Sequence, residues 1–278
     1  MIQRMIRERV RIKGKNMTIC KQEIRSQKMM LLIWGGAIGA FVAICVFLFP
    51  QMGKEAEKAS EMFSSMGSFS AAFGMDKLDI GTIAGFYAVE SGNILGIGGA
   101  FFAAILGISA LMKEEKERTA SFLFMHPVSR KRVVTEKLIS TGVILLILNV
   151  IIFLFSLGSL AAIGELGALQ DIGMIHVAQF LLQLEIAGIC FGISAYISRG
   201  GIGIGIGLAA MLYFLNIVAN MTESAKVLKY ITPFGFTEGS ELISTHRIEL
   251  KYLIPGMVLM VIGIILGYMK YLKKDLSE

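Results

Sequence analysis

Four polar side chains that could do chemistry lie inside long apolar segments of the sequence. They are Asn149, Gln179, Gln183 and Glu185. If these segments cross a membrane, an ionisable side chain among them costs about 3 kcal/mol on insertion scales, which makes it a functional candidate. Two kinds of role are open for Glu185. It lines a transport path, or it forms a hydrogen bond with Asn149 or with a partner subunit.

Neither a metal site nor a proton relay is predicted around these residues. At helical spacing, His176, Gln179 and Gln183 share one face, whereas Glu185 points elsewhere. The other histidines and the three cysteines have no short spacing, so no thiolate metal site or disulfide framework is expected. Those residues are His126, His246, Cys20, Cys45 and Cys190.

Common enzyme motifs are also missing from the sequence. It has no G-x-x-x-x-G-K-[ST] phosphate loop, so we do not expect this chain itself to hydrolyse ATP. Intramembrane CAAX-type proteases carry Glu-Glu-x-x-x-Arg with membrane histidines downstream. Here two residues, not three, separate Glu114-Glu115 from Arg118, and no later span offers a matching histidine. We therefore predict no catalytic residue, no bound cofactor and no metal ion on this chain.

The elements that carry these residues are predicted from hydropathy. Hydrophobic residues make up 55% of the 278, charged residues only 17%, and the mean hydropathy is +0.68, whereas a soluble domain has about 25% charged residues. A membrane span needs about 20 mostly apolar residues. Six such segments lie at about 31–49, 92–112, 138–162, 174–197, 201–220 and 252–271. We predict an all-α integral membrane protein with six transmembrane helices, forming one transmembrane domain over residues 17–278.

The distribution of basic residues predicts the orientation of these spans. Of the 27 lysines and arginines, 20 lie in the segments on one side of the six spans, together with both termini. Because basic loops stay in the cytoplasm, both termini are expected there. The fourth and fifth spans, joined near residues 198–200, are expected to form an antiparallel hairpin.

Residues 1–16 form a basic N-terminal extension, MIQRMIRERVRIKGKN. This extension is either a polybasic arm on anionic lipid or a stretch ahead of a native start at Met17. Residues 17–30 place apolar side chains on one helical face, which predicts an interfacial entry helix before the first span. The alternative is that they simply extend that span into water.

Two further patterns concern helix packing. After Pro50, apolar residues at three- and four-residue steps as far as Gly74 predict an amphipathic outer helix, with a substrate-contacting lid as the alternative. The second and fifth spans repeat small residues every four positions. This spacing predicts close packing between helices, with a helix that slides during a transport cycle as the alternative.

Residues 113–132, KEEKERTASFLFMHPVSRKR, join the second and third spans. Lys113/Glu117 and Glu114/Arg118 are i, i+4 pairs, which predict that the second span continues as a helix beyond the bilayer. Thr119 or Ser121 is expected to begin a short new helix.

That short helix carries Phe122, Leu123, Phe124 and Met125 and ends at His126-Pro127, because the residue before proline avoids the α region. Ser129 is the expected N-cap of the helix that carries Arg130 into the third span. The loop thus presents an apolar tip in a basic rim, which needs a protein partner or the lipid interface.

This block resembles the cytoplasmic loop of bacterial type-2 ABC transporter permeases. Glu-Glu-Lys-Glu-Arg-Thr at 114–119 and Phe-Leu-Phe-Met-His-Pro-Val-Ser-Arg at 122–130 carry the resemblance, followed by Lys137. Ala120-Ser121 and His126 depart from the pattern. Outside this block, the entry helix, the six spans and Tyr-Ile-Thr-Pro-Phe at 230–234 are similar but less specific.

The resemblance implies that residues 119–126 form a coupling helix seated in a separate ATP-binding subunit. It further implies a second permease subunit, as homo- or heterodimer, with ATP and Mg bound by the ATPase. Phe122, Leu123 and Phe124 would pack against the ATPase. The remaining loop residues would stiffen the connection or set its return angle; they are Glu114, Glu115, Glu117, Arg118, Thr119, Pro127, Ser129 and Arg130.

We therefore expect the permease subunit of an ATP-driven exporter in a bacterial plasma membrane, in contact with lipid and with no nucleic-acid partner. The alternative is a self-sufficient secondary transporter or channel, although such transporters usually carry several ionisable residues at mid-depth. A structural or immunity-type binding protein is a third class. The substrate cannot be read from the sequence.

Overall fold

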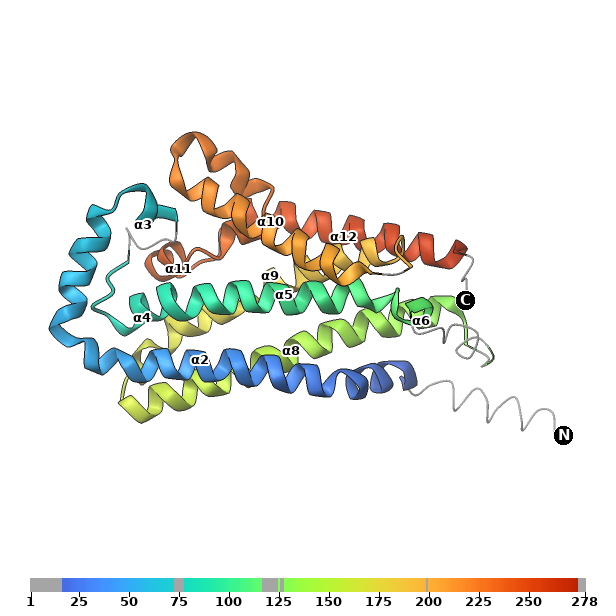
Figure 1. Cartoon of the computed structure of the whole chain (residues 1–278), viewed down its shortest axis with the longest axis horizontal. Coiled ribbons are helices and arrows are strands. Elements are labelled where there is room, and N and C mark those ends of the chain that lie inside the picture. The colour runs from blue at the N-terminus through green and yellow to red at the C-terminus, as the bar shows by residue number, and fades with distance from the viewer. Residues whose placement is uncertain (1–16, 73–77, 117–124, 126–127, 199, 275–278) are drawn as a thin grey trace.

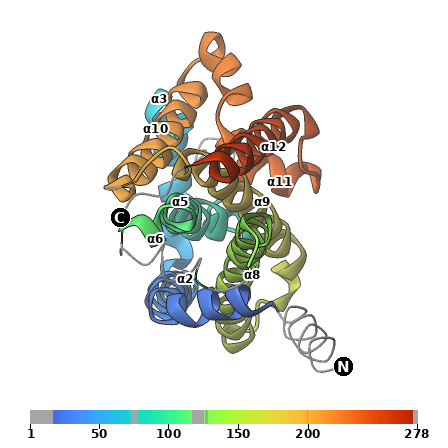
Figure 2. The ribbon, with the colours of Figure 1, turned by 90° about the vertical axis from the view of Figure 1, so that its right-hand side faces the viewer.

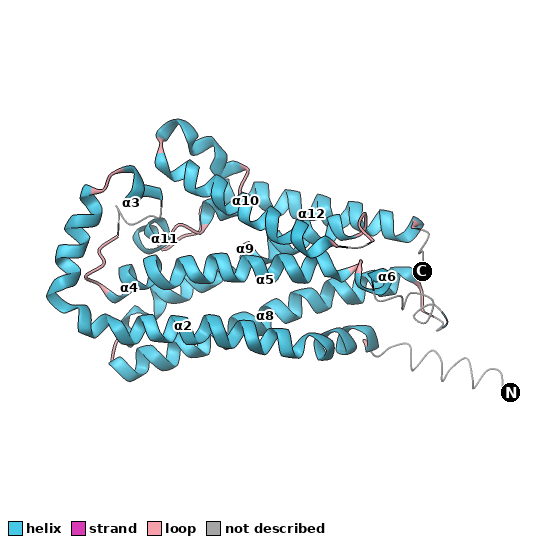
Figure 3. Cartoon of the chain, in the orientation of Figure 1, coloured by secondary structure: helices cyan, strands magenta, loops and turns pink. Residues whose placement is uncertain are grey.

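The computed structural model describes residues 17–72, 78–116, 125, 128–198 and 200–274. Its elements are helices joined by turns and loops (Figure 3). The six long helices are built from α2 (Thr18–Ser65), α5 (Gly92–Ala110), α8 (Arg130–Ile163), α9 (Leu169–Ser194), α10 (Gly201–Met221) and α12 (Leu250–Lys273). The shorter elements are α3 (Ser68–Ala72), α4 (Ile83–Phe86), η1 (Tyr87–Ser91), α6 (Lys113–Lys116), η2 (Leu166–Ala168), η3 (Glu223–Tyr230), η4 (Pro233–Phe236) and α11 (Gly239–Thr245).

Six helices of the described chain are long and apolar enough to cross a membrane, which confirms the predicted number. The second begins earlier than predicted, at Ile83 rather than near residue 92. Its first turns, α4 and the π-helix η1, include Glu90 and are therefore less apolar than the part selected by hydropathy. The helix of the third span begins at Arg130, where the predicted N-cap at Ser129 places its start.

Helix α2 is longer and more continuous than predicted. The entry segment is not a separate helix, since hydrogen-bonded helix runs from Thr18 to Ser65. In the end view its first turns lie across the end of the bundle, while later turns are seen along their axis (Figure 2). The predicted outer helix is likewise the continuation of α2 past Pro50. It ends at Ser65, before a turn at Gly67 with φ +56°.

The spans pack around α5 and α9 at the centre of the bundle (Figure 2). Helix α2 packs along α8, while α9 contacts α5, α8 and α12. Helix α9 is the most buried span. A short connection joins the fourth and fifth spans as predicted. The two helices do not pack together as a hairpin, because α10 packs mainly against α5 rather than against α9.

Glycines permit the closest helix contacts. A Cβ atom on Gly107 of α5 would lie 2.3 Å from the backbone oxygen of Ala187, and one on Gly192 would lie 2.3 Å from that of Gly263. Small residues thus bring α9 against α5 and α12. Between the two spans with the predicted four-residue spacing, a Cβ atom on Gly205 of α10 would lie 3.0 Å from the backbone oxygen of Ala104 in α5.

The bundle has two different ends (Figure 1). We call "the base" the end where α2 begins, α6 lies and α12 finishes. The other end, "the distal end", carries α3, α4 and α11. Helix α6 and the start of α8, which flank the segment predicted to couple, lie at the base.

Candidate coupling site at the base

The structure describes only part of the predicted coupling loop. Glu117, Arg118, Thr119, Phe122, Leu123, Phe124 and Pro127 lie outside the described residues. Met125 is helical and 74% exposed. The hydroxyl of Ser129 accepts a hydrogen bond from the backbone N–H of Arg132 at 3.3 Å, so Ser129 is the N-cap of α8 as predicted. The loop therefore returns into the third span through a capped helix start.

Lys137 of α8 is the best-buried charged residue at the base, with 1% of its surface exposed. Its Nζ atom lies 2.5 Å from Glu114 Oε1 and 3.1 Å from Glu23 Oε1, and donates to the backbone oxygen of Ala110 at 2.6 Å. These three acceptors match the three N–H groups of an ammonium. The Ala110 oxygen belongs to the last residue of α5, where a cation also interacts favourably with the helix dipole. Lys137 thereby joins α2, α5, α6 and α8.

The acidic pair that begins the predicted lever arm points into the bundle rather than along its own helix. Glu114 pairs with Lys137, while the Oε2 atom of Glu115 lies 2.9 Å from Lys274 Nζ. Lys274 follows α12, and its ammonium also donates to the backbone oxygen of Ile197 at 3.4 Å. Within the described residues, Lys113 pairs with Glu23 at 3.3 Å. Helix α6 is therefore held by α2, by α8 and by the end of α12.

Arg130 adds a second contact with the end of α12. Its guanidinium donates to the backbone oxygens of Lys274 at 2.5 Å and Leu272 at 3.4 Å. These carbonyls lie at a helix C-terminus, where backbone oxygens lack partners within the helix. The residue expected to set the return angle of the loop thus fastens the start of α8 to the end of α12.

Glu136 fixes the start of α2. Its Oε2 atom accepts hydrogen bonds from the backbone N–H groups of Ile19 at 2.8 Å and Cys20 at 3.1 Å. The other carboxyl oxygen accepts from Arg132 at 2.6 Å. A carboxylate at a helix N-terminus satisfies free N–H groups and complements the dipole. The entry turns of α2 are therefore capped by a side chain from another helix.

We name the charged residues that hold α6 the base clasp. They are Glu23, Lys113, Glu114, Glu115, Lys137 and Lys274. Glu23, Lys274 and the capping residue Glu136 were not predicted, because their partners on other helices lie 90 to 159 residues away along the chain. A single sequence carries no local signal for such pairs. The base clasp connects α6, which precedes the loop, to α2, α8 and the end of α12. Its described residues hold helices together and are not arranged to make or break a covalent bond.

The intramembrane polar residues form hydrogen bonds across helices. Asn149 Nδ2 donates to Gln183 Oε1 at 2.6 Å, which joins α8 to α9. Gln179 Nε2 donates to the backbone oxygen of Gly92 at 3.4 Å. The suggested hydrogen bond between Glu185 and Asn149 is wrong, because Asn149 pairs with Gln183 and with the oxygen of Leu145.

Glu185 is 1% exposed, and neither of its carboxyl oxygens has a hydrogen-bond partner among the described residues. Its carboxyl group lies against Gly256 of α12, where a Cβ atom would be only 2.0 Å from Oε2. A buried polar group without a partner is unfavourable. The Glu185 carboxyl group therefore limits how closely α9 and α12 approach each other at Gly256.

His176 belongs to a small polar cluster that sequence analysis did not predict. Its Nε2 atom lies 2.8 Å from the Tyr87 hydroxyl and 3.1 Å from the Ser156 hydroxyl, and the two hydroxyls are 2.7 Å apart. The cluster joins η1, α8 and α9. No group of three or more His, Cys, Asp or Glu residues in the described chain is arranged to hold a metal ion.

A family model described as "ABC-2 family transporter protein" matches residues 20–276. No curated protein matches the chain. The family match includes both the loop block and all six membrane-spanning helices.

Proposed function

The chain belongs to the ABC-2 transporter family, and from this premise we propose that it is the membrane subunit of an ATP-driven exporter. A separate ATPase binds the loop between α6 and α8, and a second permease subunit completes the membrane part. The ATPase holds ATP and Mg. The protein lies in a bacterial plasma membrane with the base, and hence both termini, in the cytoplasm.

The observation that carries this proposal is the base clasp. Helix α6 directly precedes the loop, and its Glu114 and Glu115 are paired with Lys137 and Lys274. A force on the loop therefore reaches α8 and the end of α12 through short ion pairs. Residues 119–126, which resemble a coupling helix, supply the surface for the ATPase.

In this mechanism ATP is a ligand that biases two arrangements of the bundle. Such a ligand shifts the equilibrium only by its difference in affinity between the two states. ATP binding draws the two ATPases together and moves the attached loops. The base clasp transmits this motion to the spans. The transport path of the bundle then opens to the other side of the membrane.

Co-purification of the ATPase subunit tests the proposal. We expect Phe122→Asp with Leu123→Asp to leave the protein in the membrane but to reduce ATPase retention about tenfold or more, because two charges would enter an apolar interface. The matched control is Val227→Asp with Ile231→Asp, two exposed apolar positions in and beside η3. This control should retain the ATPase. Undiminished retention by the loop variant would contradict the assignment.

A further inference from the structure

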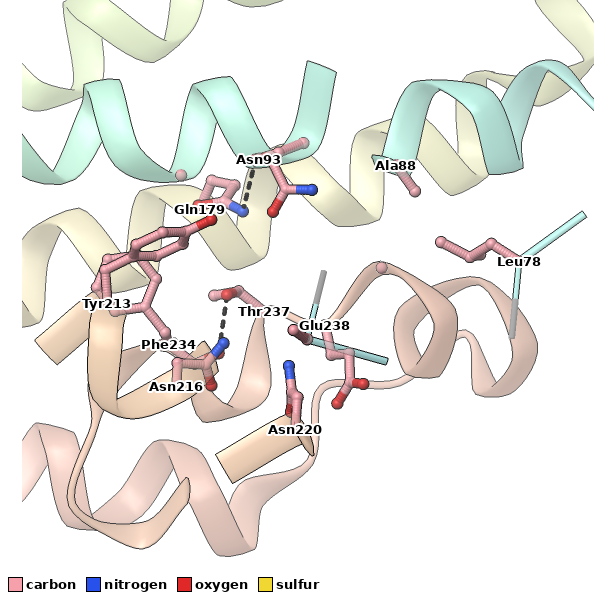
Figure 4. A pocket seen from close by; sticks show the side chains of 14 residues that line it. Leu78, Ala88, Asn93, Gln179, Tyr213, Asn216, Asn220, Phe234, Thr237 and Glu238 are labelled. Carbon is pink, nitrogen blue, oxygen red and sulfur yellow. Dashed lines mark hydrogen bonds between the residues drawn. The ribbon is translucent and has the colours of Figure 1, made fainter. Parts of the chain in front are cut away.

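A polar pocket lies at the distal end, apart from the base clasp (Figure 4). Water molecules could be centred within about 50 Å³ of this pocket, several times the roughly 10–15 Å³ that one water needs, and part of its boundary is open. Its walls come from the start of α5, the middle of α9, the end of α10, η4 and the start of α11. Helices of three different spans thus meet around one partly open space.

Four side-chain amides line this pocket. Asn93 and Gln179 lie on one side, and Asn216 and Asn220 face them from the other (Figure 4). Each amide offers both a donor and an acceptor. Such a concentration is unusual inside an apolar bundle, where polar side chains are few and expensive to insert.

The amide groups have unused hydrogen-bonding capacity. Gln179 is only 3% exposed, and one atom of its amide has no partner although the other is bonded to Gly92. Among the described residues, one buried amide atom of Asn216 and one of Asn220 are also without a partner. A Cβ atom on Gly96 would lie 3.3 Å from the Gln179 amide, so the glycine leaves room for that side chain. The pocket therefore presents polar groups that a ligand or water would satisfy.

The described residues that line the pocket carry no unbalanced charge. Glu238 lies at its wall, but the Glu238 carboxylate forms a buried ion pair with Lys229. Aromatic rings contribute a further wall, where Tyr213 and Phe234 pack edge to face with centroids 5.3 Å apart. A ligand that fits needs several neutral hydrogen-bonding groups and an apolar face.

We propose that this pocket binds a neutral, hydroxyl-rich ring such as a hexose unit. Neighbouring hydroxyls each donate and accept, which matches the paired donor and acceptor of an amide. The apolar face of the ring packs on Tyr213 or Phe234. The sugar is either free or the headgroup of a lipid, because the pocket lies beside the membrane-spanning part of α10.

A peptide fits the same amides less well. Peptides are usually held by a strand edge, a long helix groove or an aromatic groove for an extended chain. The described pocket instead presents short side-chain amides from opposite walls. A compact ring satisfies opposite walls simultaneously, whereas an extended chain leaves most of its backbone groups outside.

That the pocket holds transported cargo rests on the proposed function, whereas sugar binding by the pocket does not. Sugar binding is measured on the isolated chain, without the ATPase. Failure to bind sugar would leave co-purification of the ATPase intact. Loss of co-purification would leave sugar binding intact, so the two failures are distinguishable.

The test is native mass spectrometry of the full chain in tetraethylene glycol monooctyl ether, a detergent without sugar. The probes are n-dodecyl β-D-maltoside, free maltose, and octaethylene glycol monododecyl ether, which has the same tail without sugar. N-acetyl-tetraalanine amide is the peptide probe. We expect one saturable maltoside adduct per chain and no saturable adduct of the sugar-free amphiphile.

Variants locate the binding. Asn216→Leu with Asn220→Leu should weaken maltoside binding about tenfold or more, since two amide contacts of about 1 kcal/mol each are lost. Leucine is well tolerated in a membrane helix, so the variant should remain folded. Gln170→Leu is the matched control, because Gln170 is an exposed amide in the first turn of α9 and outside the pocket.

Each outcome decides the proposal. Pocket-dependent binding of maltose and maltoside alike would support a free sugar, and binding of maltoside alone would support a lipid headgroup. Absence of saturable sugar binding, or binding that the pocket variant does not weaken, would overturn the proposal. Pocket-dependent binding of the peptide without the sugar would also overturn it.

Discussion

Lys137 shows how a single residue can organise the base. Its ammonium is buried, and two carboxylates and one backbone oxygen surround it. Taking these charges out of water is unfavourable, and their mutual attraction offsets that penalty only while all partners are present. The residue therefore fixes geometry more than it adds net stability.

Removing Lys137 alone should be strongly destabilising. We expect Lys137→Met to lower the free energy of unfolding by about 3 kcal/mol, because Glu114 would remain buried without its cation and Glu23 would keep only Lys113. Adding Glu23→Gln and Glu114→Gln should recover most of this loss. Thermal unfolding of the chain in detergent measures the effect.

The control for this prediction is Lys251→Met. Lys251 also pairs with a glutamate, at 2.6 Å from Glu249, but its side chain is 52% exposed. Exposed ion pairs contribute little because water screens them. Similar unfolding temperatures for Lys137→Met and the wild type would show that the buried charges are not coupled.

At the scale of elements, close contact between α9 and α12 depends on glycine. Gly192→Ala would place a Cβ atom 2.3 Å from the backbone oxygen of Gly263, which cannot move without shifting α12. We expect a loss of about 1–3 kcal/mol in the free energy of unfolding from overpacking. Gly173→Ala is the control in the same helix, since a Cβ atom there has no neighbour within 4 Å. It should leave stability unchanged or raise it by at most about 1 kcal/mol.

The same unfolding measurement decides this prediction. Equal stability of Gly192→Ala and Gly173→Ala would mean that α9 and α12 pack less closely than the structure indicates. A loss confined to Gly192→Ala would support the contact, because both changes add the same methyl group to one helix.

The existence of the six spans could be predicted, because each must present about 20 apolar residues to lipid. The points at which helices continue or end could not be predicted. Hydropathy ends at Pro50, yet α2 persists to Ser65. Likewise, the short connection after α9 predicts a hairpin but not that α10 packs on α5. Proline bends a helix without always ending it, and packing partners depend on surfaces that one sequence does not pair.

The candidate site was predictable in the same uneven way. Ser129 could be found because an N-cap is a local pattern. Glu114 and Glu115 could be selected, but their partners Lys137 and Lys274 could not be assigned. Spacing along one helix suggests i, i+4 ion pairs. The described ion pairs of Glu114 and Glu115 instead join separate helices. Only the folded chain brings them together.

For the whole molecule, the base clasp implies that α6, with the loop that follows it, and the C-terminal end of α12 move as one unit. Glu115 and Lys274 connect them directly, while Arg130 holds the same helix end through backbone oxygens. Removing the ion pair would leave the spans inserted and the ATPase bound. It would change only how motion of the loop reaches α12.

This consequence can be measured by pulsed electron paramagnetic resonance in the complex with its ATPase. Spin labels at Met125→Cys and Met269→Cys occupy exposed positions, whereas the native cysteines are buried. We expect the distance between these labels to stay constant on addition of a non-hydrolysable ATP analogue, but to shift or broaden in Glu115→Gln with Lys274→Met. A reference pair at Met125→Cys and Val227→Cys, which spans the base and the distal end, should change in both proteins. If the first distance changes equally in both proteins, α12 does not follow the loop. If it stays constant in both, α12 follows the loop by another route, and either result would show that the base clasp does not transmit the motion.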